Sequence, residues 1–385
     1  MNDLNNFAQY LTEEELATVA PMLERLSTLE DRDERSQNYM SFVKHVWPQF
    51  IEGRHHKIYA EKLQAVADGK LKRLIINMPP RHTKSEFASY LFPTWLMGRR
   101  PDLKIIQATH TAELAVGFGR KIKNLIETEE FKDVFPTVSL APDAKASGRW
   151  STSGGGEYYA VGVGGALAGR GADLAIIDDP VSEQDALSTT ALDHIYDWYT
   201  SGPRQRLQPG GAIIIVMTRW SIRDLTAKVL AKQGEKGADK WDIVEFPAIM
   251  PSGEPLWPEY WSLDELNGVK ASIPVAKWNA QYMQNPTAEE GAIIIVMTRW
   301  SIRDLTAKVL AKQSEKGADK WDIVEFPAIM PSGDPLWPEY WSLDELNSVK
   351  ASIPVAKWNS QYMQNPTAEE GAIIKRDWWR KWEKE

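Results

Sequence analysis

The sequence predicts an α/β protein in which a mainly parallel sheet carries helices on both of its faces. Short apolar runs alternate with helix-like segments from residue 73 to about residue 233. Most of these runs are continuously apolar, which is typical of parallel strands that are buried on both faces. Two of the runs end in side chains suited to phosphate and metal chemistry. Since ligands bind at the carboxyl edge of such sheets, we expect a site there.

The first of these runs leads into a phosphate-binding turn. Residues 73–86 read RLIINMPPRHTKSE, a short strand followed by a turn and the start of a helix. The Lys84 ammonium would neutralise the β- and γ-phosphates of a nucleoside triphosphate, and backbone N–H groups would cradle them. The residues expected to bind the nucleotide in this turn are Pro80, Arg81, His82, Thr83, Lys84, Ser85 and Glu86.

The turn departs from the G-x-x-x-x-G-K-[ST] pattern. Met78 and Thr83 occupy the two glycine positions, where glycine is favoured because the backbone needs unusual dihedral angles close to phosphate. Pro79 and Pro80 would compensate by stiffening the turn. The alternative is an ordinary strand–turn–helix connection that carries an exposed lysine.

The second run supplies acidic residues. Residues 173–180 read DLAIIDDP, a strand that ends in Asp178 and Asp179. Asp178 and the Ser85 hydroxyl are oxygen ligands suited to Mg²⁺. Asp179 precedes Pro180, and an aspartate before proline is common at the start of a turn. The lysine turn followed by the acidic strand predicts a site for ATP and Mg²⁺.

Composition limits the remaining possibilities. The chain has 385 residues, 43% hydrophobic and 25% charged residues, and a formal net charge of −8. That balance is typical of a globular protein and argues against a large static DNA-binding face. The chain contains no cysteine, which excludes disulfides and thiolate metal sites. Its acidic N-terminus is unlike a secretory signal, and no apolar run approaches the length of a membrane span.

The elements follow from apolar patterning and helix signals. Gly69 and Gly98 mark helix ends, and Thr111 is a suitable helix N-cap. The predicted helices cover 12–30, 55–68, 84–97, 111–128, 185–200 and 221–233, and the predicted strands cover 73–77, 104–110, 158–165, 173–178 and 212–217. Because Lys84, Asp178 and Thr218 each follow a predicted strand, one sheet edge would collect all three.

A tandem repeat occupies the C-terminal part of the chain. Residues 211–290, here copy one, and 291–370, copy two, differ only at Gly234/Ser314, Glu254/Asp334, Gly268/Ser348 and Ala280/Ser360. The tetrapeptide GAII begins both copies and recurs at 371–374, which favours recombination, with a sequence-assembly artefact as the alternative. Copy one keeps the shorter connection to the acidic strand, so we expect it to complete the sheet and copy two to form a displaced module.

The motifs together resemble the ATPase motor of the large terminase subunit of tailed bacteriophages. The segments that carry the resemblance are PQFIEGRHHKIYAEKLQAV, RLIINMPPRHTKSE, KIIQATHTAELA, GVGGALAGRGADLAIIDDP and IVMTRW, in order between about residues 40 and 290. The resemblance implies a P-loop NTPase of the ASCE/RecA-like type that packages DNA using ATP. It implies double-stranded DNA, a small terminase subunit and a portal protein as partners, and a homo-oligomeric ring in the host cytoplasm, transiently at the procapsid portal, with no membrane.

The resemblance also implies a domain organisation. We expect an N-terminal helical segment at 1–40, an ATPase domain at 41–290, the duplicated copy at 291–370 and a linker at 371–385. Full-length members of the family continue into a nuclease domain, and no later acidic strand here would supply its metal ligands. We therefore expect no DNA cleavage by this chain alone.

The resemblance assigns further roles. Arg81, Lys84 and Ser85 match the phosphate motif, with Arg81 near the γ-phosphate, and Asp178 matches the metal aspartate. Asp179 stands where many members carry the catalytic glutamate, so which carboxylate acts as base stays open.

Four more residues are assigned from their positions. Thr218 and Arg219 match the motif that couples hydrolysis to movement. His56, or the aromatic residues near Trp47, would contact adenine. Arg170 is either an arginine finger that reaches a neighbouring subunit or a loop residue paired with an aspartate such as Asp173.

Two other functions fit parts of the sequence. Duplication could have left a remnant that binds nucleotide or terminase proteins without turnover. A different P-loop ATPase, such as a helicase, would need a second motor lobe, and the repeat shows no second phosphate turn.

Overall fold

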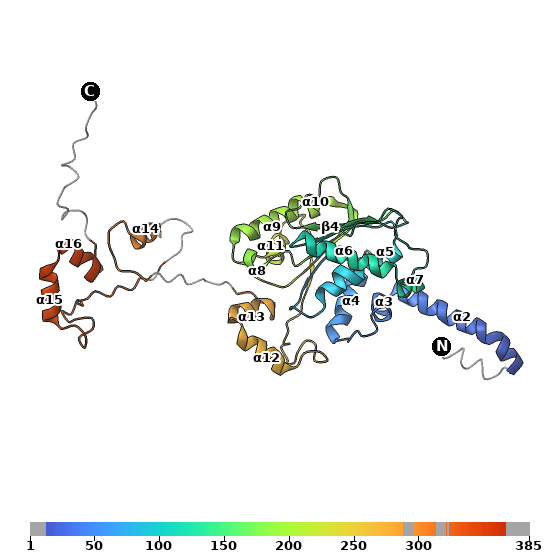
Figure 1. Ribbon diagram of the computed structural model, residues 1–385, viewed down its shortest axis with the longest axis horizontal. Coiled ribbons are helices and arrows are strands. Elements are labelled where there is room, and N and C mark those ends of the chain that lie inside the picture. Colours follow the sequence, from blue (N-terminus) through green and yellow to red (C-terminus); the bar gives the residue numbers. More distant parts are fainter. Residues whose placement is uncertain (1–12, 288–295, 313–320, 322, 367–385) are drawn as a thin grey trace, which may run out of the picture. The chain divides into compact units, whose positions relative to one another are not determined.

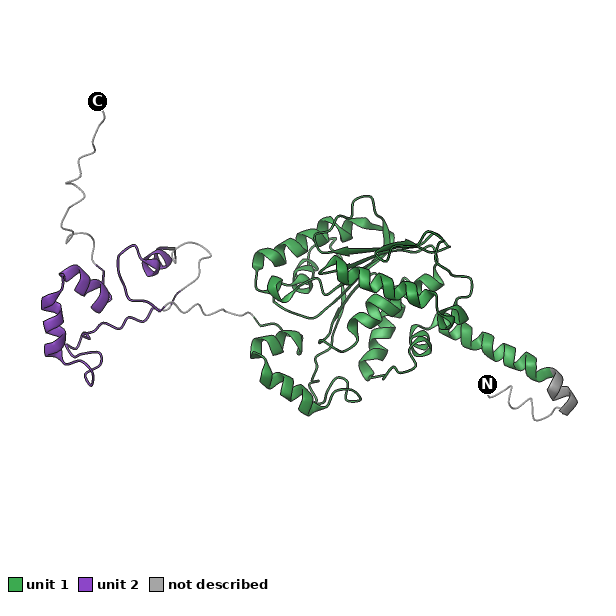
Figure 2. Ribbon diagram, viewed as in Figure 1, with its two compact units in different colours: residues 1–289 green, residues 290–385 purple. Residues whose placement is uncertain are grey.

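The computed structural model describes residues 13–287, 296–312, 321 and 323–366, and it forms two compact units (Figures 1 and 2). Unit 1 is Met1–Glu289 and unit 2 is Glu290–Glu385. The linker expected at 371–385 and most of the strand that copy two would supply, at 291–295, lie outside the described residues. Among the residues that are described, no helix is long and apolar enough to cross a membrane.

Unit 1 is built on a seven-stranded sheet in the order β3-β4-β2-β5-β6-β1-β7. Only β3 runs antiparallel to its neighbour, so the expected α/β class with a mainly parallel sheet is confirmed. The strands are β1 (Arg73–Asn77), β2 (Lys104–Thr109), β3 (Arg149–Ser151), β4 (Glu157–Gly162), β5 (Ala172–Asp178), β6 (Leu207–Met217) and β7 (Asp242–Glu245).

Helices cover both faces of this sheet (Figure 1). The helices that precede β3 in the chain are α2 (Glu13–Gln37), α3 (Tyr39–Val46), α4 (Arg54–Ala67), α5 (Phe92–Arg99), α6 (Ala112–Ile126) and α7 (Glu129–Val134). The helices between β5 and β7 in the chain are α8 (Glu183–Ala186), α9 (Thr189–Ser201), α10 (Pro203–Arg206) and α11 (Leu225–Lys232). The hairpin that follows consists of α12 (Leu263–Ser272) and α13 (Val275–Gln281).

The alternation of side chains along each strand produces two apolar cores. Leu74 and Ile76 of β1 join the core that contains α3 to α7, whereas Ile75 between them joins the core that contains α9 and α11. The β1 strand is therefore apolar on both faces, as its sequence indicates.

The structure refines two predicted helices. The helix expected from Lys84 begins there, passes into a π-helical segment, η1 (Glu86–Leu91), and continues as α5. Pro93 lies at this junction and has no N–H to donate, which favours a change of hydrogen-bond pattern there. The single helix expected at 185–200 is two helices, because Ser188 caps a new one at Thr189.

Copy one supplies the strand beside the acidic strand. Residues Ala212–Val216 of β6 pair with Leu174–Asp178 of β5 on one side, and Ile213–Met217 pair with β1 on the other. Copy one also provides β7, which pairs with β1 at the sheet edge. This arrangement agrees with the shorter connection that favoured copy one.

The described part of copy two forms local helices. Its helices are α14 (Leu305–Lys312), α15 (Leu343–Ser352) and α16 (Val355–Lys357), followed by the π-helical turn η2 (Trp358–Tyr362). Leu346 and Trp358 are buried in unit 2, as Leu266 and Trp278 are in unit 1, so the hairpin core forms in both copies.

Candidate functional site

The phosphate turn and the acidic strand meet at the carboxyl edge of the sheet. Lys84 lies in the turn after β1, and its Nζ is 2.7 Å from Oδ2 of Asp179. The Ser85 hydroxyl donates to Oδ1 of Asp178 at 3.0 Å. Although β6 separates β1 from β5, the turn reaches across it. The four residues on which the sequence interpretation most depends therefore lie in one place.

Asp178 is suited to a cation. Its carboxylate is buried, and Oδ2 has no hydrogen-bond partner among the described residues. Burial raises its pKa to about 7, and the neighbouring Asp179 adds to this effect, whereas Lys84 and the hydrogen bond from Ser85 oppose it. A divalent cation held by Ser85 Oγ and Asp178 would give the orphaned oxygen a partner, so the residues present fit Mg²⁺.

Lys84 keeps its charge in this setting. Burial opposes the ammonium form, but the Asp179 and Asp178 carboxylates outweigh burial and raise the pKa of Lys84 above its usual value. A buried ammonium on a short turn is the group expected to hold a polyphosphate.

Three non-glycine residues of the site have left-handed backbones. They are Arg81 (φ 61°), Thr83 (φ 65°) and Asp179 (φ 41°). Such conformations are strained for residues with a Cβ and cluster at functional sites. Arg81 is exposed, so its side chain is free to meet a ligand, while the partly exposed Pro80 and Glu86 flank the turn.

The histidines near the turn do not face a ligand. His82 is buried, with Nδ1 2.8 Å from the Pro80 carbonyl and its ring stacked on Trp261, so only its backbone is available to phosphate. His56 is also buried, and both ring nitrogens are hydrogen-bonded within the protein. The expected contact of His56 with adenine is therefore wrong.

Burial keeps these imidazoles neutral. It lowers the pKa of His56 to about 2 and that of His82 to about 4, and the adjacent His55 is lowered to about 3. Nearby cationic groups contribute secondarily. None of the three titrates near pH 7.

Asp179 joins the acidic strand to the end of β6. Its Oδ1 accepts a hydrogen bond from the Thr218 N–H at 2.8 Å, while its Oδ2 pairs with Lys84. The Thr218 hydroxyl donates to the Met78 carbonyl at 3.3 Å. One carboxylate therefore contacts both Lys84 and the residue that follows β6.

Arg219 is engaged away from the phosphate turn. Its Nε donates to Asp224 Oδ2 at 2.9 Å and its Nη1 to Glu245 Oε1 at 3.2 Å, while its backbone N–H donates to Gln284 Oε1. Asp224 is the N-cap of α11. Sequence reasoning missed Asp224, Glu245 and Gln284; an aspartate just before an apolar helical run was the available signal for the first of these.

Arg170 lies apart from these contacts. Its guanidinium carbon is 4.7 Å from the centre of the Tyr159 ring, a cation–π arrangement. Asp173 instead accepts a hydrogen bond from the Lys104 backbone N–H. No ion pair of Arg170 with Asp173, one of the two alternatives, occurs among the described contacts, and the other alternative, an arginine finger toward a neighbouring subunit, stays a prediction.

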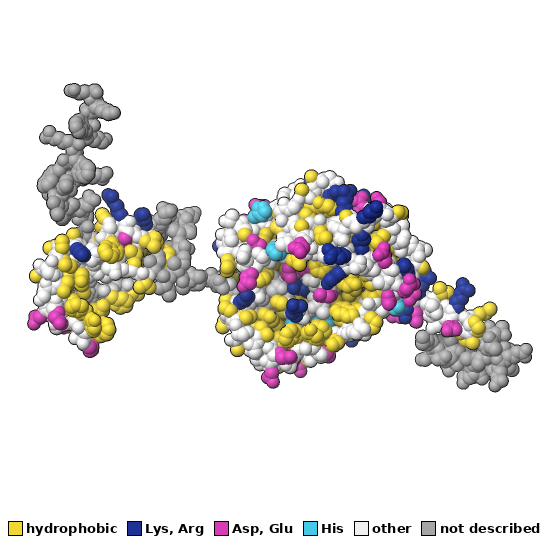
Figure 3. Space-filling model, in the orientation of Figure 1, with side chains coloured by type: hydrophobic (Ala, Val, Ile, Leu, Met, Phe, Trp, Pro, Cys, Tyr) yellow, Lys and Arg dark blue, Asp and Glu magenta, His cyan; other side chains and the backbone are white. Residues whose placement is uncertain are grey.

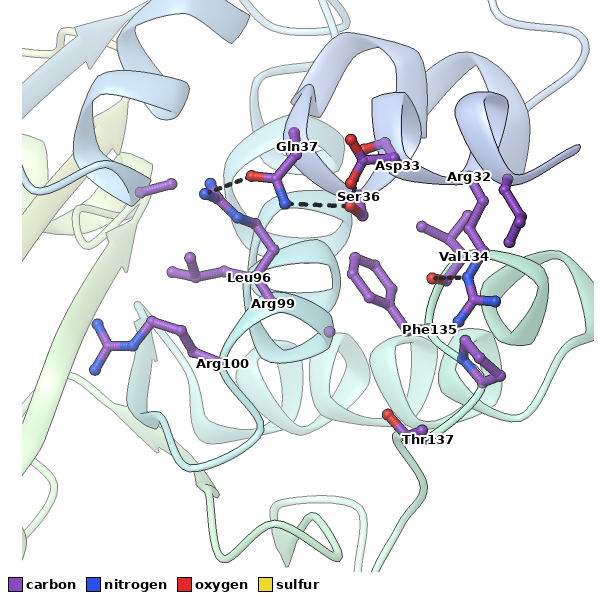
Figure 4. Close-up of a pocket in the computed structure, with 14 residues that line it drawn as sticks. Arg32, Asp33, Ser36, Gln37, Leu96, Arg99, Arg100, Val134, Phe135 and Thr137 are labelled. Carbon is purple, nitrogen blue, oxygen red and sulfur yellow. Dashed lines mark hydrogen bonds between the residues drawn. The ribbon is translucent and has the colours of Figure 1, made fainter. Parts of the chain in front are cut away.

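A separate cavity of about 570 Å³ is lined by residues of α2, α5 and the segment after α7 (Figure 4). Arg99 donates to Gln37 across it, and Arg32 donates to the Val134 carbonyl. No residue predicted for nucleotide binding lines this cavity.

Comparisons with known proteins return bacteriophage large terminases. The HK97 large terminase is similar at 12% identity and TM-score 0.44, over 65% of this chain and 55% of that one. The ATPase domain of the Thermus phage P74-26 large terminase is similar at 16% identity and TM-score 0.37, over 59% of this chain and 93% of that one. A large terminase from a thermophilic bacteriophage, in complex with ATP-γ-S, is similar at 10% identity and TM-score 0.37, over 58% and 51%.

These solved structures belong to the class of protein that the sequence motifs resemble, and the likeness concerns the fold. This chain spans about half the length of the HK97 protein. No protein-family model matches the sequence, and no curated protein matches it significantly.

Proposed function

We propose that this chain is the ATP-hydrolysing motor part of a phage DNA-packaging terminase. The observation that carries the proposal is the meeting of Lys84 and Ser85 with Asp178 and Asp179 at one sheet edge, with one buried Asp178 oxygen unpaired. An ammonium, a hydroxyl and two carboxylates in this arrangement are what phosphoryl transfer from ATP to water requires.

In this proposal Lys84 moves from Asp179 to the β- and γ-phosphates. Ser85 Oγ and Asp178 would hold Mg²⁺, and the cation would neutralise charge on the phosphate oxygens. Asp179, released from Lys84, accepts a proton from the water whose oxygen attacks the γ-phosphorus as the bond to the β-phosphate oxygen breaks. The exposed Arg81 would stabilise charge on the γ-phosphate.

The contact of Asp179 with Thr218 N–H supports a route from hydrolysis to movement. When Asp179 changes partner, the end of β6 and the adjoining Arg219 would respond. Arg219 is tied to β7 through Glu245 and to the residues after α13 through Gln284, so the response would reach the hairpin. Double-stranded DNA, a small terminase subunit, a portal protein and a ring of copies in the host cytoplasm belong to this proposal, as does Arg170 acting on a neighbouring subunit.

The direct test is ATP turnover by the full chain with and without double-stranded DNA. Lys84→Ala should lower kcat/KM by about 100-fold or more, because it removes the main phosphate cation. Lys72→Ala, at an exposed lysine just before β1, is the matched control and should leave turnover within about twofold. Unchanged turnover in Lys84→Ala would contradict the proposal, and a wild-type chain that binds ATP without turnover would favour the remnant.

A further inference from the structure

Thr83 occupies a backbone conformation that its side chain disfavours. Its φ is 65°, in the left-handed region, at the place where the usual phosphate motif carries glycine. A β-branched residue in this region is a genuine outlier and persists only where its surroundings impose the conformation. The neighbouring Lys84 and Ser85 are the groups that touch Asp179 and Asp178, so the shape at Thr83 sets their positions.

One side chain contacts the Thr83 hydroxyl from outside the turn. Nε2 of His56, in the first turn of α4, lies 2.7 Å from Thr83 Oγ1. The other ring nitrogen, Nδ1, accepts a hydrogen bond from the Gly53 N–H at 2.8 Å. Since Nδ1 accepts, the ring proton is assigned to Nε2, which donates to Thr83. The Thr83 hydroxyl then donates to the His82 carbonyl at 2.5 Å.

The His56 ring has no freedom to turn away. It is fully buried and stacks on Phe87 with ring centres 5.0 Å apart. The Phe50 and Trp257 rings lie edge-to-face with it, with ring centres 4.7 Å and 4.9 Å from its own. Phe87 belongs to η1, the helical segment after the turn. His56 therefore contacts both Thr83 in the turn and the segment that follows it.

We propose that His56 is a positioning residue that holds Thr83 in its left-handed conformation and thereby keeps the turn shaped for a polyphosphate chain. In this chain a buried hydrogen bond from α4 performs the task that glycine performs in the usual motif. The inference rests on the proposed function, since the ligand class is the triphosphate of a nucleotide.

The expected consequence concerns binding more than chemistry. Without the His56 donor, Thr83 relaxes toward negative φ and the Lys84 N–H and side chain shift from the polyphosphate. Part of the binding free energy is then used to restore the left-handed conformation of Thr83. KM therefore rises, whereas the nucleotide that is bound still reacts at nearly the same rate.

The experiment is a double-mutant cycle in the full chain. His56→Phe keeps an aromatic ring of similar size and removes the donor; we expect KM for ATP to rise about tenfold with kcat within about twofold. Thr83→Gly removes both the hydroxyl and the strain, so in that background His56→Phe should change KM by less than about twofold. His56→Gln restores a donor and should recover part of the loss.

His55→Phe is the matched control for packing: His55 is equally buried and its ring centre lies 3.8 Å from that of His56, so the variant disturbs the surroundings of His56, but His55 makes no hydrogen bond to Thr83 among the described hydrogen bonds. It should leave KM within about twofold. Equal effects of His55→Phe and His56→Phe, or an undiminished effect of His56→Phe beside Thr83→Gly, would overturn the inference.

A second measurement separates this inference from the proposed function. Hydrogen exchange at the Thr83 and Lys84 amides of the nucleotide-free chain should be faster in His56→Phe than in His55→Phe. Equal rates would overturn the positioning role of His56 even if ATP binds. If exchange is faster in His56→Phe but the wild-type chain binds neither ATP nor inorganic tripolyphosphate, the positioning role of His56 is supported and the proposed function is contradicted.

Discussion

At the scale of single residues, the site depends on carboxylates whose environments differ. Asp178 is buried with an unpaired oxygen, whereas Asp179 is partly exposed and shared between Lys84 and the Thr218 N–H. Burial makes the Asp178 charge costly until a cation neutralises it. In the proposed function, Asp179 accepts a proton after Lys84 has moved to the phosphates.

The raised pKa of Asp178 predicts a pH dependence of stability. Its pKa is about 7 in the folded chain, well above that of an unfolded aspartate. Between about pH 4 and 7 the folded state therefore holds a proton that the unfolded state has lost, so the free energy of unfolding falls as pH rises through this range. The raised pKa of Lys84 acts only at much higher pH, as its charge is present in both states below that.

Asp178→Asn should remove this decline. We expect the metal-free variant to be more stable than the wild type at pH 8 by about 1–3 kcal/mol and similar to it at pH 4, measured by urea denaturation in EDTA. Asp197→Asn, at an exposed aspartate, is the control and should show no such gain. Equal stability of Asp178→Asn and wild type at pH 8 would mean that the buried carboxylate carries no such cost.

At the scale of elements, the two copies show how the surroundings in unit 1 change the burial of one sequence. In copy one, Trp257 is 4% exposed and Phe246 is 4% exposed; in copy two, Trp337 is 59% and Phe326 is 62% exposed. In unit 1, Trp257 packs edge-on against His55 and His56, and Arg54 pairs with the nearby Glu254. The same segment therefore folds its hairpin locally in both places, but buries its apolar face only beside β1 and α4.

This contrast predicts unequal effects of matched substitutions. Trp257→Ala should lower the free energy of unfolding of unit 1 by about 3–5 kcal/mol, because it empties a packed site. Trp337→Ala changes an exposed side chain and should lie within about 0.5 kcal/mol of the wild type. Urea denaturation followed by circular dichroism measures both, and a similar loss in the two variants would show that copy two is packed as copy one is.

At the scale of the whole molecule, the sheet of unit 1 has one position between β5 and β1, and two copies of the repeat could supply the strand that fills it. β6 and β7 come from copy one, and together they flank β1 on both sides. Copy two keeps large apolar side chains exposed, among them Trp300 and Val324, and Figure 3 shows apolar side chains at the surface of unit 2. Exposed apolar surface of this kind favours association.

Removing copy two should therefore leave the site intact. A chain lacking residues 291–370 joins Glu290 to the third GAII segment and keeps every contact described for unit 1. We expect its thermal midpoint for unit 1 to stay within about 2 °C and its ATP turnover within about twofold, with less aggregation on light scattering. A lower midpoint or lost turnover would assign copy two a part in the ATPase fold.

Sequence reasoning recovered most of the sheet and the centre of the site, because both depend on local signals. Continuous apolar runs indicated β1, β2, β5 and β6, and parallel topology placed the residues after them at one edge. The errors lie where remote segments meet. His56 was assigned to adenine because nothing in its own helix indicates that Phe87, Trp257 and Thr83 enclose it.

The order of the lysine turn and the acidic strand by itself determined the candidate chemistry of this chain, because a turn type and a strand end are encoded over a few neighbouring residues. The tertiary structure decided which oxygen of Asp178 lacks a partner, what constrains Thr83 and which copy of the repeat is buried. Those outcomes depend on burial and on contacts between residues far apart in the chain. Two nearly identical segments therefore reached different environments here.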